Sequence, residues 1–165
     1  MPIWPFRRKA TKGSVGPSPT PPSKRVLSFL SPHQIQSLGG LPAEAIAGGF
    51  EGETTSVDAF RQNRVFVDFM HQVIRAAGPK DPGLQAAAHA QGDGWVYIID
   101  LRTPEGPNGR VPPEDIIGAF EVRNGRIIAG SYQPSTTHRV YTQNGLVCLP
   151  PSLLRAFVDQ LPKVR

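Results

Sequence analysis

The chain contains a single cysteine, Cys148, among its 165 residues. One cysteine excludes an internal disulfide and a metal site built from cysteines alone, and it is typical of a reducing compartment. No apolar run approaches the roughly 18 residues of a membrane-spanning helix. The basic N-terminus lacks the apolar stretch that completes a secretory signal. We therefore expect a cytoplasmic protein.

Sequence motifs of the common catalytic and cofactor-binding sites are also missing. The Gly-x-Gly motif Gly92-Asp93-Gly94 precedes a predicted strand and does not open a helix, so it is not a phosphate-binding loop. Neither a serine elbow nor a nucleotide-binding fingerprint occurs. Four histidines occur without the short spacings of zinc ligands: His33, His71, His89 and His138. The sequence therefore predicts no catalytic residue, no metal site and no cofactor.

Positive charge is concentrated at the N-terminus. Six of the 18 basic residues, and none of the 13 acidic ones, lie within residues 1–25. The rest of the chain then carries 12 basic and 13 acidic residues, too little positive charge for a phosphate-binding surface. Because this proline-rich segment buries too little apolar area to offset its ordering entropy, we predict a disordered tail over residues 1–25. It serves as a solubilising tail, or makes weak contact with anionic lipid or nucleic acid.

Capping residues and hydrophobic spacing indicate several helices. Ser31-Pro32 and Asp81-Pro82 each have the form of an N-cap followed by proline at the first helical position. The longest helix is predicted within Glu51–Ala77, capped by Thr55 or Ser56. Its apolar residues follow the spacing of one helical face: Phe60, Phe66, Phe69, Met70, Val73, Ile74 and Ala77.

The strands are predicted in the second half of the chain. Trp95–Leu101 is apolar on both faces, which is typical of a central strand. Residues 102–114 are rich in proline and glycine and are expected to form a loop. Asn124-Gly125 suits a type I′ hairpin turn, which would pair Val122 with Ile127. The face that includes Val122 is the better core face, and we expect the long helix to cover it.

These elements together predict an α+β fold. It consists of an antiparallel sheet of three to five strands with a central hairpin, covered mainly on one face by helices, behind the disordered tail. A chain of 165 residues is long enough for one domain with a core and too short for two sizeable ones. We predict a single domain over residues 26–165.

The candidate binding residues lie in or beside two polar loops, residues 102–114 and 133–139. Loops held by a rigid scaffold are common places for binding. The candidates are Arg102, Arg110, Tyr132, His138 and Arg139. The alternative, that these are ordinary solvated side chains, remains open. Cys148 lies between two apolar residues, and we predict an inert, buried thiol.

Part of the chain resembles the small bacterial proteins labelled type VII secretion system-associated. The similar segments are the strand Gly94–Asp100, the stretch Gly109–Phe120 with its Gly-Arg-Val-Pro-Pro and Ile-Gly-Ala, Gly125-x-Ile127, and Tyr132-Gln133-Pro134. Where that family has Asn-Pro-x-Tyr-Arg, this chain has the residues 134–139. The resemblance implies a non-catalytic accessory or immunity-like protein, and it transfers no catalytic residue.

We accordingly expect a protein-binding role, with a secreted effector or toxin of a bacterial secretion or toxin system as the partner, and no enzyme activity. Such a protein should expose an apolar or aromatic patch. The first alternative is a small hydrolase or transferase, which requires His138 within hydrogen-bond reach of Asp100 or Asp115. The second alternative is a weak nucleic-acid or membrane-surface binder that acts through the tail.

Overall fold

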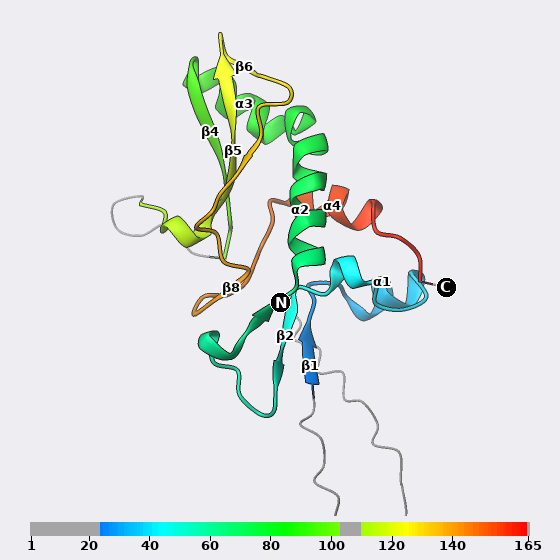
Figure 1. The fold of residues 1–165 in the computed structure, drawn as a ribbon. Coiled ribbons are helices and arrows are strands. Elements are labelled where there is room, and N and C mark those ends of the chain that lie inside the picture. The colour runs from blue at the N-terminus through cyan, green and yellow to red at the C-terminus, as the bar shows by residue number, and fades with distance from the viewer. Residues whose placement is uncertain (1–23, 103–109, 165) are drawn as a thin grey trace, which may run out of the picture. The chain divides into compact units, whose positions relative to one another are not determined.

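The computed structural model describes residues 24–102 and 110–164 and is shown in Figure 1. Its strands are β1 (Lys24–Leu27), β2 (Gly48–Glu51), β3 (Arg61–Gln62), β4 (Gly94–Ile99), β5 (Ile116–Arg123), β6 (Arg126–Ile127), β7 (Gln133–Pro134), β8 (Tyr141–Thr142) and β9 (Gly145–Leu146). Its α-helices are α1 (Pro32–Ser37), α2 (Arg64–Ala77), α3 (Pro82–Gln91) and α4 (Pro151–Asp159). Single turns of 3₁₀-helix are η1 (Ala43–Ala45), η2 (Val57–Ala59), η3 (Gly78–Lys80) and η4 (Pro113–Asp115). The predicted α+β class with antiparallel sheets is confirmed.

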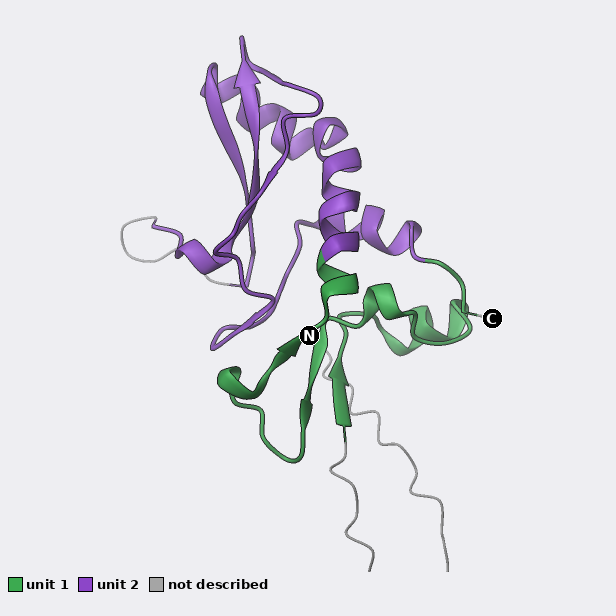
Figure 2. Cartoon of the chain, in the orientation of Figure 1, with its two compact units in different colours: residues 1–67, 162–165 green, residues 68–161 purple. Residues whose placement is uncertain are grey.

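The chain divides into two compact units, coloured separately in Figure 2. Unit 1 comprises the residues up to Val67 together with those from Pro162 onward, and unit 2 is Asp68–Leu161. The single domain expected over residues 26–165 therefore stays a prediction. The tail predicted over residues 1–25 lies outside the described residues, except that β1 begins at Lys24, two residues before the predicted boundary.

Unit 1 is built on a three-stranded antiparallel sheet with β2 in the centre. Leu27 of β1 and Phe50 of β2 are buried, and the Arg25 guanidinium lies over the Phe50 ring, 5.7 Å from its centroid. Helix α1 follows, and Ser31 caps it as predicted: its side chain accepts from the Gln34 backbone N–H, and the Gln34 side chain accepts from the Ser31 N–H. This reciprocal cap satisfies two backbone donors at the helix start.

Helix α2 begins at Arg64, later than the sequence predicted. The predicted cap residues precede η2 instead, and the Phe60 ring packs edge-on against Phe50, with centroids 5.4 Å apart. Asn63 defines the helix start, because its Oδ1 accepts from the Val65 backbone N–H at 3.2 Å. The helix runs from unit 1 into unit 2. Its predicted apolar face is confirmed by four fully buried side chains: Phe66, Met70, Val73 and Ile74.

The main sheet of unit 2 has β5 at its centre, with β4 on one side and β6 and β7 on the other. The β5–β6 hairpin has the predicted register, with Val122 opposite Ile127. Asn124 and Gly125 have φ angles of 51° and 74°, the left-handed values that a type I′ turn requires. Local turn chemistry therefore sets this register.

One face of this sheet forms the core of unit 2. Phe120 and Val122 are fully buried on it, and the Tyr132 ring packs on Phe120 at a centroid distance of 5.0 Å. Tyr132 also covers Gly118, where a Cβ atom would lie only 2.5 Å from the Tyr132 hydroxyl. Gly118 is thus required by the close approach of an aromatic side chain and not by its backbone conformation.

Strand β4 lies at the edge of the sheet, which corrects its predicted central position. Among the described residues its one partner strand is β5. Val96 and Ile98 point into the core and are buried, whereas Trp95, Tyr97 and Ile99 point to the other face and are exposed. The sequence suggested burial of both faces because both are apolar, but no described helix or strand covers the outer one.

Two further elements complete unit 2. Helix α3 begins at the predicted cap Asp81, whose Oδ2 accepts from the Leu84 backbone N–H at 2.9 Å. The Asp81 Oδ1 accepts from the hydroxyl of Ser152 in the first turn of α4, which ties the two helix starts together. The Phe157 ring of α4 packs on Phe69 of α2 at 4.9 Å.

Candidate functional site

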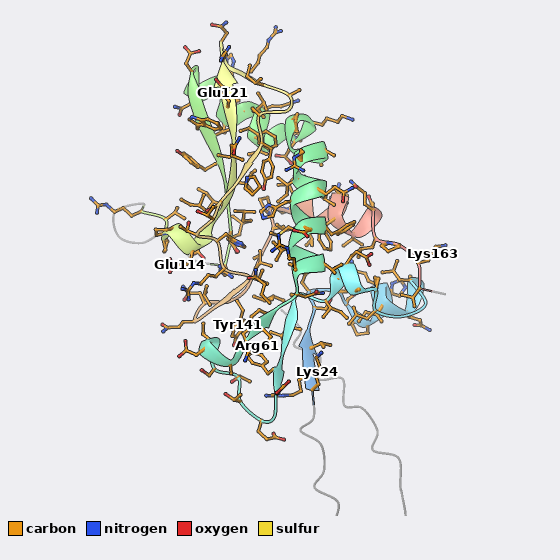
Figure 3. The ribbon with its side chains drawn as sticks, viewed as in Figure 1. Lys24, Arg61, Glu114, Glu121, Tyr141 and Lys163 are labelled. Atoms are coloured by element: carbon orange, nitrogen blue, oxygen red, sulfur yellow. The ribbon has the colours of Figure 1, made fainter. Side chains whose placement is uncertain are left out.

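Four charged or titratable side chains meet at the end of β4 and β5 that is remote from the hairpin. They form what we call the polar cluster: Asp100, Arg102, Asp115 and His138. Each of the four side chains is at most 3% exposed. Figure 3 shows the labelled Glu114, next to Asp115, at this end of β5, and Glu121 near the hairpin end. The chain positions the cluster where three separate segments converge.

Arg102 is the centre of the polar cluster. Its Nε lies 2.8 Å from Asp115 Oδ1 and 3.5 Å from Asp100 Oδ2. Its two remaining nitrogens donate to four backbone carbonyl groups, which are those of Glu114, Arg139, Val140 and Gly145. An arginine that satisfies all its donors inside the protein acts as a structural cross-link between loops.

Asp100 is held by several hydrogen-bond donors. Its Oδ1 accepts from the backbone N–H groups of Cys148, at 2.8 Å, and Arg102, at 3.1 Å. Its Oδ2 lies 3.1 Å from His138 Nε2. A buried carboxylate is tolerated when several donors and a cation compensate its lost hydration, and Asp100 meets this condition.

The His138–Asp100 contact is the geometry that the hydrolase alternative requires. The distance of 3.1 Å is within hydrogen-bond reach. However, the His138 side chain is only 3% exposed, and the Asp100 side chain is fully buried. Without a rearrangement, neither group can receive a proton from a substrate in solution. The arrangement therefore supports a positioning role for His138 more directly than a catalytic one.

Cys148, the one cysteine, lies next to the polar cluster and is partly exposed. Burial and the nearby Asp100 carboxylate raise the pKa of its thiol above the ordinary value. A cysteine nucleophile needs the opposite shift, because the thiolate is the reactive form. The raised pKa agrees with the predicted inert thiol, whereas the predicted burial is wrong, because Cys148 is partly exposed.

A second pair of titratable groups lies on the core face. Tyr132 Oη is 2.6 Å from His71 Nδ1, and the Arg75 guanidinium lies 5.5 Å from the centroid of the Tyr132 ring. Burial, followed by repulsion from His138 and Arg75, lowers the pKa of His71 to about 4. Burial raises the pKa of Tyr132. At neutral pH, we assign the Tyr132 hydroxyl as donor to Nδ1 of a neutral His71.

The five candidate residues from the sequence fall into two groups. Arg102 and His138 meet in the polar cluster, and Tyr132 is buried at 4% exposure against Phe120. Arg110 and Arg139 have exposed side chains, although the backbone carbonyl of Arg139 accepts from Arg102. Three of the five thus have internal partners and offer little to a ligand.

The sequence did not reveal the group of large exposed apolar side chains that the described part of unit 2 presents. Strand β4 and Leu101, two residues after its end, present four side chains to solvent, with exposed fractions of 41%, 54%, 37% and 52%. We call these the aromatic stripe: Trp95, Tyr97, Ile99 and Leu101. The sequence signal was the alternation of large residues on a strand with no charged residue from Gly94 to Ile99.

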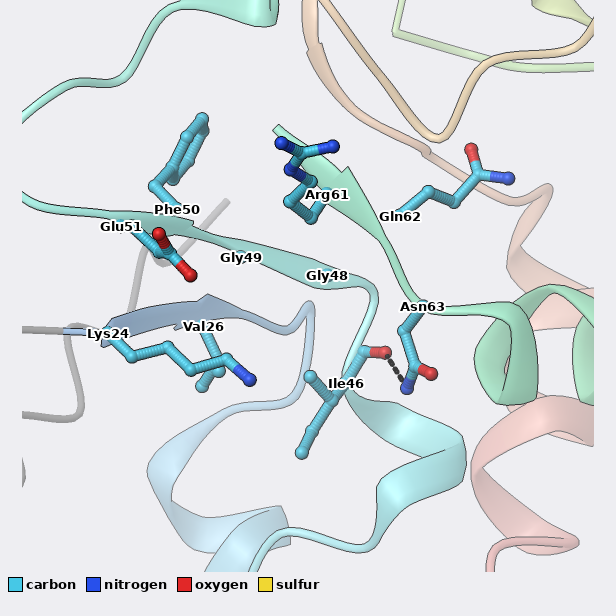
Figure 4. A pocket seen from close by; sticks show the side chains of 10 residues that line it. All are labelled: Lys24, Val26, Ile46, Gly48, Gly49, Phe50, Glu51, Arg61, Gln62 and Asn63. Carbon is cyan, nitrogen blue, oxygen red and sulfur yellow. Dashed lines mark hydrogen bonds between the residues drawn. The ribbon is translucent and has the colours of Figure 1, made fainter. Parts of the chain in front are cut away.

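Unit 1 contains a shallow hollow of about 380 Å³, shown in Figure 4. Gly48 and Gly49 of β2 form its floor, with Lys24 on one side and Arg61 on the other. A glycine is required at position 49 by the structure of the sheet itself, because a Cβ atom there would lie 2.3 Å from the Arg25 carbonyl oxygen. The charged residues around the hollow are exposed, and no buried polar group points to a particular ligand among the residues that line it.

The described residues contain neither a cluster of metal-ligating side chains nor a membrane-spanning helix. Within residues 24–102 and 110–164, no three His, Cys, Asp or Glu side chains are arranged to hold a metal ion. None of the helices in the described parts of the chain has the length and apolar character to cross a membrane. Comparisons of the chain with protein-family models, with curated proteins and with solved structures give no significant match.

Proposed function

We propose that this chain is a non-catalytic protein-binding accessory protein that contacts its partner through the aromatic stripe. The observation that carries the proposal is the exposure of Trp95 and Tyr97, at 41% and 54%, side by side on one strand. Tryptophan and tyrosine are the residues most enriched among the energetically dominant contacts of protein interfaces. Natural edge strands usually carry charges or proline that discourage contact, and β4 carries neither.

The class of partner follows from the resemblance to type VII secretion system-associated proteins. The similar segments include β4 and most of β5, so they include the strand that bears the aromatic stripe. The proposed partner is a secreted effector or toxin with an apolar surface, and this chain would be its accessory or immunity protein. The buried polar cluster supports the stripe by fixing the end of β4.

The test is a pull-down from the native lysate with the immobilised full-length chain. We expect one protein in stoichiometric amount, and its loss with Trp95→Ser combined with Tyr97→Ser. Val65→Ser is the matched control, because Val65 is a 47% exposed apolar side chain outside the stripe. Equal retention of the partner by the stripe variant and the control would refute the proposed surface.

A truncation separates this proposal from a role of the basic tail. Deleting residues 1–23 leaves β1 intact, since the strand begins at Lys24. The stripe proposal expects the truncated chain to retain the partner. Nucleic acid or lipid bound only by the full-length chain, and released by salt, would assign the function to the tail instead.

The hydrolase alternative has one supporting observation, the 3.1 Å contact between His138 and Asp100. It is tested with purified protein on a panel of ester, amide and phosphoester substrates. Activity that disappears in His138→Gln while the folded structure persists, as judged by circular dichroism, would favour it. If the parent protein turns over no substrate faster than the His138→Gln variant does, protein binding remains the better proposal.

A further inference from the structure

Strand β4 has a free backbone edge in addition to its apolar face. The β5–β6 hairpin determines which backbone groups point to this free edge. Arg123 and Arg126 flank a two-residue turn and therefore exchange backbone hydrogen bonds with each other. Odd-numbered residues of β5 consequently direct their N–H and C=O groups away from β4. Two bonds agree with this phase, because the Glu121 and Ile117 carbonyls accept from Ile128 and Ser135.

The even-numbered residues of β5 therefore bond to β4. Val122, Phe120 and Gly118 face Gly94, Val96 and Ile98 in the register, so the backbone groups of Trp95 and Tyr97 point outward. A β-bulge shifts the register between Ile98 and Ile99. Beyond it the Asp100 N–H donates inward to the Asp115 carbonyl at 2.8 Å, so the backbone groups of Ile99 also point outward. The next odd-numbered residue confirms the phase, since the Leu101 N–H donates outward to the Cys148 carbonyl at 2.9 Å. Among the described residues, no strand pairs with β4 on its outward side, and the outward backbone groups of these three residues form no hydrogen bond.

The free edge is complementary to itself. In an antiparallel pair of two β4 strands centred on Tyr97, that residue faces Tyr97 of the second copy, and Trp95 faces Ile99 of the second copy. All three outward positions then form hydrogen-bonded pairs, which satisfies three N–H and three C=O groups of each copy. The opposed side chains are aromatic–aromatic and aromatic–β-branched pairs, which stabilise sheets.

Charge does not oppose this pairing. Residues Gly94–Ile99 include no charged side chain and no proline, so two copies bring no like charges together. The nearest ion pair on the same face, Arg123 with Glu121, is internally neutralised at 3.0 Å. The chain's own N-terminal segment fits this edge less well than a second copy does. Residues 1–25 carry six basic groups, and the uncharged strand offers no partner for them.

We propose that two copies of this chain join through β4 to form one continuous antiparallel sheet. The symmetry is an isologous two-fold, with its axis perpendicular to the sheet at Tyr97. Such an axis places both aromatic stripes on the same side of the joined sheet. Eight large apolar side chains then form one platform.

The exposed area explains why a second copy matters. With roughly 200 Å² for a large side chain, the exposed fractions leave about 400 Å² on one stripe. A protein interface of standard size buries about 800 Å² on each partner, which is what the two stripes offer together. The dimer does not depend on the proposed function, whereas the use of the platform to bind an effector or toxin rests on it.

Sedimentation velocity of the full-length chain over a concentration series tests the dimer. We expect a concentration-dependent dimer that is lost in Tyr97→Lys and in Tyr97→Glu, because identical charges would face each other across the axis. An equimolar mixture of these two variants should restore it, with a dissociation constant at least about tenfold below that of either variant alone. Val65→Lys is the control and should dimerise like the parent.

Disulfide trapping tests the register independently. In a Cys148→Ser background, Tyr97→Cys places two thiols opposite each other, about 5.5 Å apart at Cα, which suits a disulfide. Trp95→Cys places them about 14 Å apart, four residues along the strand. We expect oxidation to cross-link the first variant and not the second.

The outcomes separate the two proposals. A chain that is monomeric at its highest soluble concentration, a dimer indifferent to charge at position 97, or equal cross-linking of both cysteine variants would overturn the β4 dimer. A dimer confirmed by these measurements but without a captured protein would refute only the proposed function. Capture of a partner by a chain that stays monomeric would refute only the β4 dimer and would support the proposed function.

Discussion

Arg102 Nε lies 2.8 Å from Asp115 Oδ1, and both side chains are 1% exposed. This buried ion pair joins the residues just after β4 to those just before β5, at the end of the sheet remote from the hairpin. Because Arg102 also bonds to the carbonyls of residues 139, 140 and 145, one side chain connects three segments. The aromatic stripe is thereby presented on a strand whose C-terminal end is anchored.

Replacement of Arg102 by Ala should destabilise the protein strongly. The variant would leave Asp100 and Asp115 buried without their cation, a loss typically of about 3–5 kcal/mol. Arg123→Ala is the control, since Arg123 is 68% exposed and pairs with a partly exposed Glu121, and such pairs contribute at most about 1 kcal/mol. Urea unfolding measures both.

Arg102→Lys provides an intermediate case if the alanine variant does not fold. Lysine keeps the charge but lacks the planar fork that reaches Asp115 and several carbonyl groups at once. We expect a loss between those of Arg102→Ala and Arg123→Ala. Equal stabilities for the Arg102 and Arg123 variants would contradict the structural role of the polar cluster.

His71 should make stability depend on pH between about 4 and 6.5. Its pKa is about 4 in the folded protein and about 6.5 in an unfolded chain, so the unfolded state binds the extra proton within this window. The contribution of His71 to the free energy of unfolding therefore increases as the pH rises from 4 to 6.5, and it is lost again as the pH falls to 4. After allowance for solvent screening, the contribution is roughly 1–2 kcal/mol.

The control for this prediction is His71→Gln, which keeps a hydrogen-bond acceptor for the Tyr132 hydroxyl but does not titrate. The difference in unfolding free energy between parent and variant should increase from pH 4 to pH 6.5 and be constant above it. Carboxylates that titrate in the same range affect both proteins and cancel in the difference. A constant difference across the window would show that His71 is not held neutral.

The sequence predicted the features that depend on neighbouring residues. The caps Ser31 and Asp81 and the turn Asn124-Gly125 act within a few residues of themselves, and all three have the predicted role. The late start of α2 was not predictable in this way. It depends on Phe60, which follows η2, packing against Phe50 of β2, and this tertiary contact overrides local helix signals.

The candidate site was predicted less well, and for a physical reason. The sequence predicts Arg102, His138 and Arg139 as exposed loop residues, but contacts with distant segments bury two of these side chains. Arg102 pairs with Asp115, and His138 lies against Asp100. Such burial of charge requires partners from several segments, and composition does not reveal it. The stripe on β4 was missed because an apolar outer face resembles a buried one in sequence.

Gly118→Ala should destabilise unit 2 through its contact with Tyr132. The added methyl carbon would lie 2.5 Å from the Tyr132 hydroxyl and 2.7 Å from a ring carbon, so the ring has to move away from Phe120. Overpacking of this kind costs about 1–3 kcal/mol. In a Tyr132→Ala background the same change should cost little, and the double-mutant cycle of unfolding free energies measures the coupling.

Cys148 provides a test of the catalytic alternative, because its reactivity reports its pKa. Burial and the Asp100 carboxylate raise the pKa of the thiol, so less thiolate is present at a given pH and alkylation by iodoacetamide should be slower than in the urea-unfolded chain. The midpoint of the pH–rate profile should lie above that of the unfolded chain, which carries the same single thiol and is the matched control.

A native thiol that reacts faster, with a lower midpoint, would contradict the inert role. It would direct attention to His138 as the base of a Cys–His pair. The predicted slow reaction instead leaves the polar cluster as a structural support for the aromatic stripe.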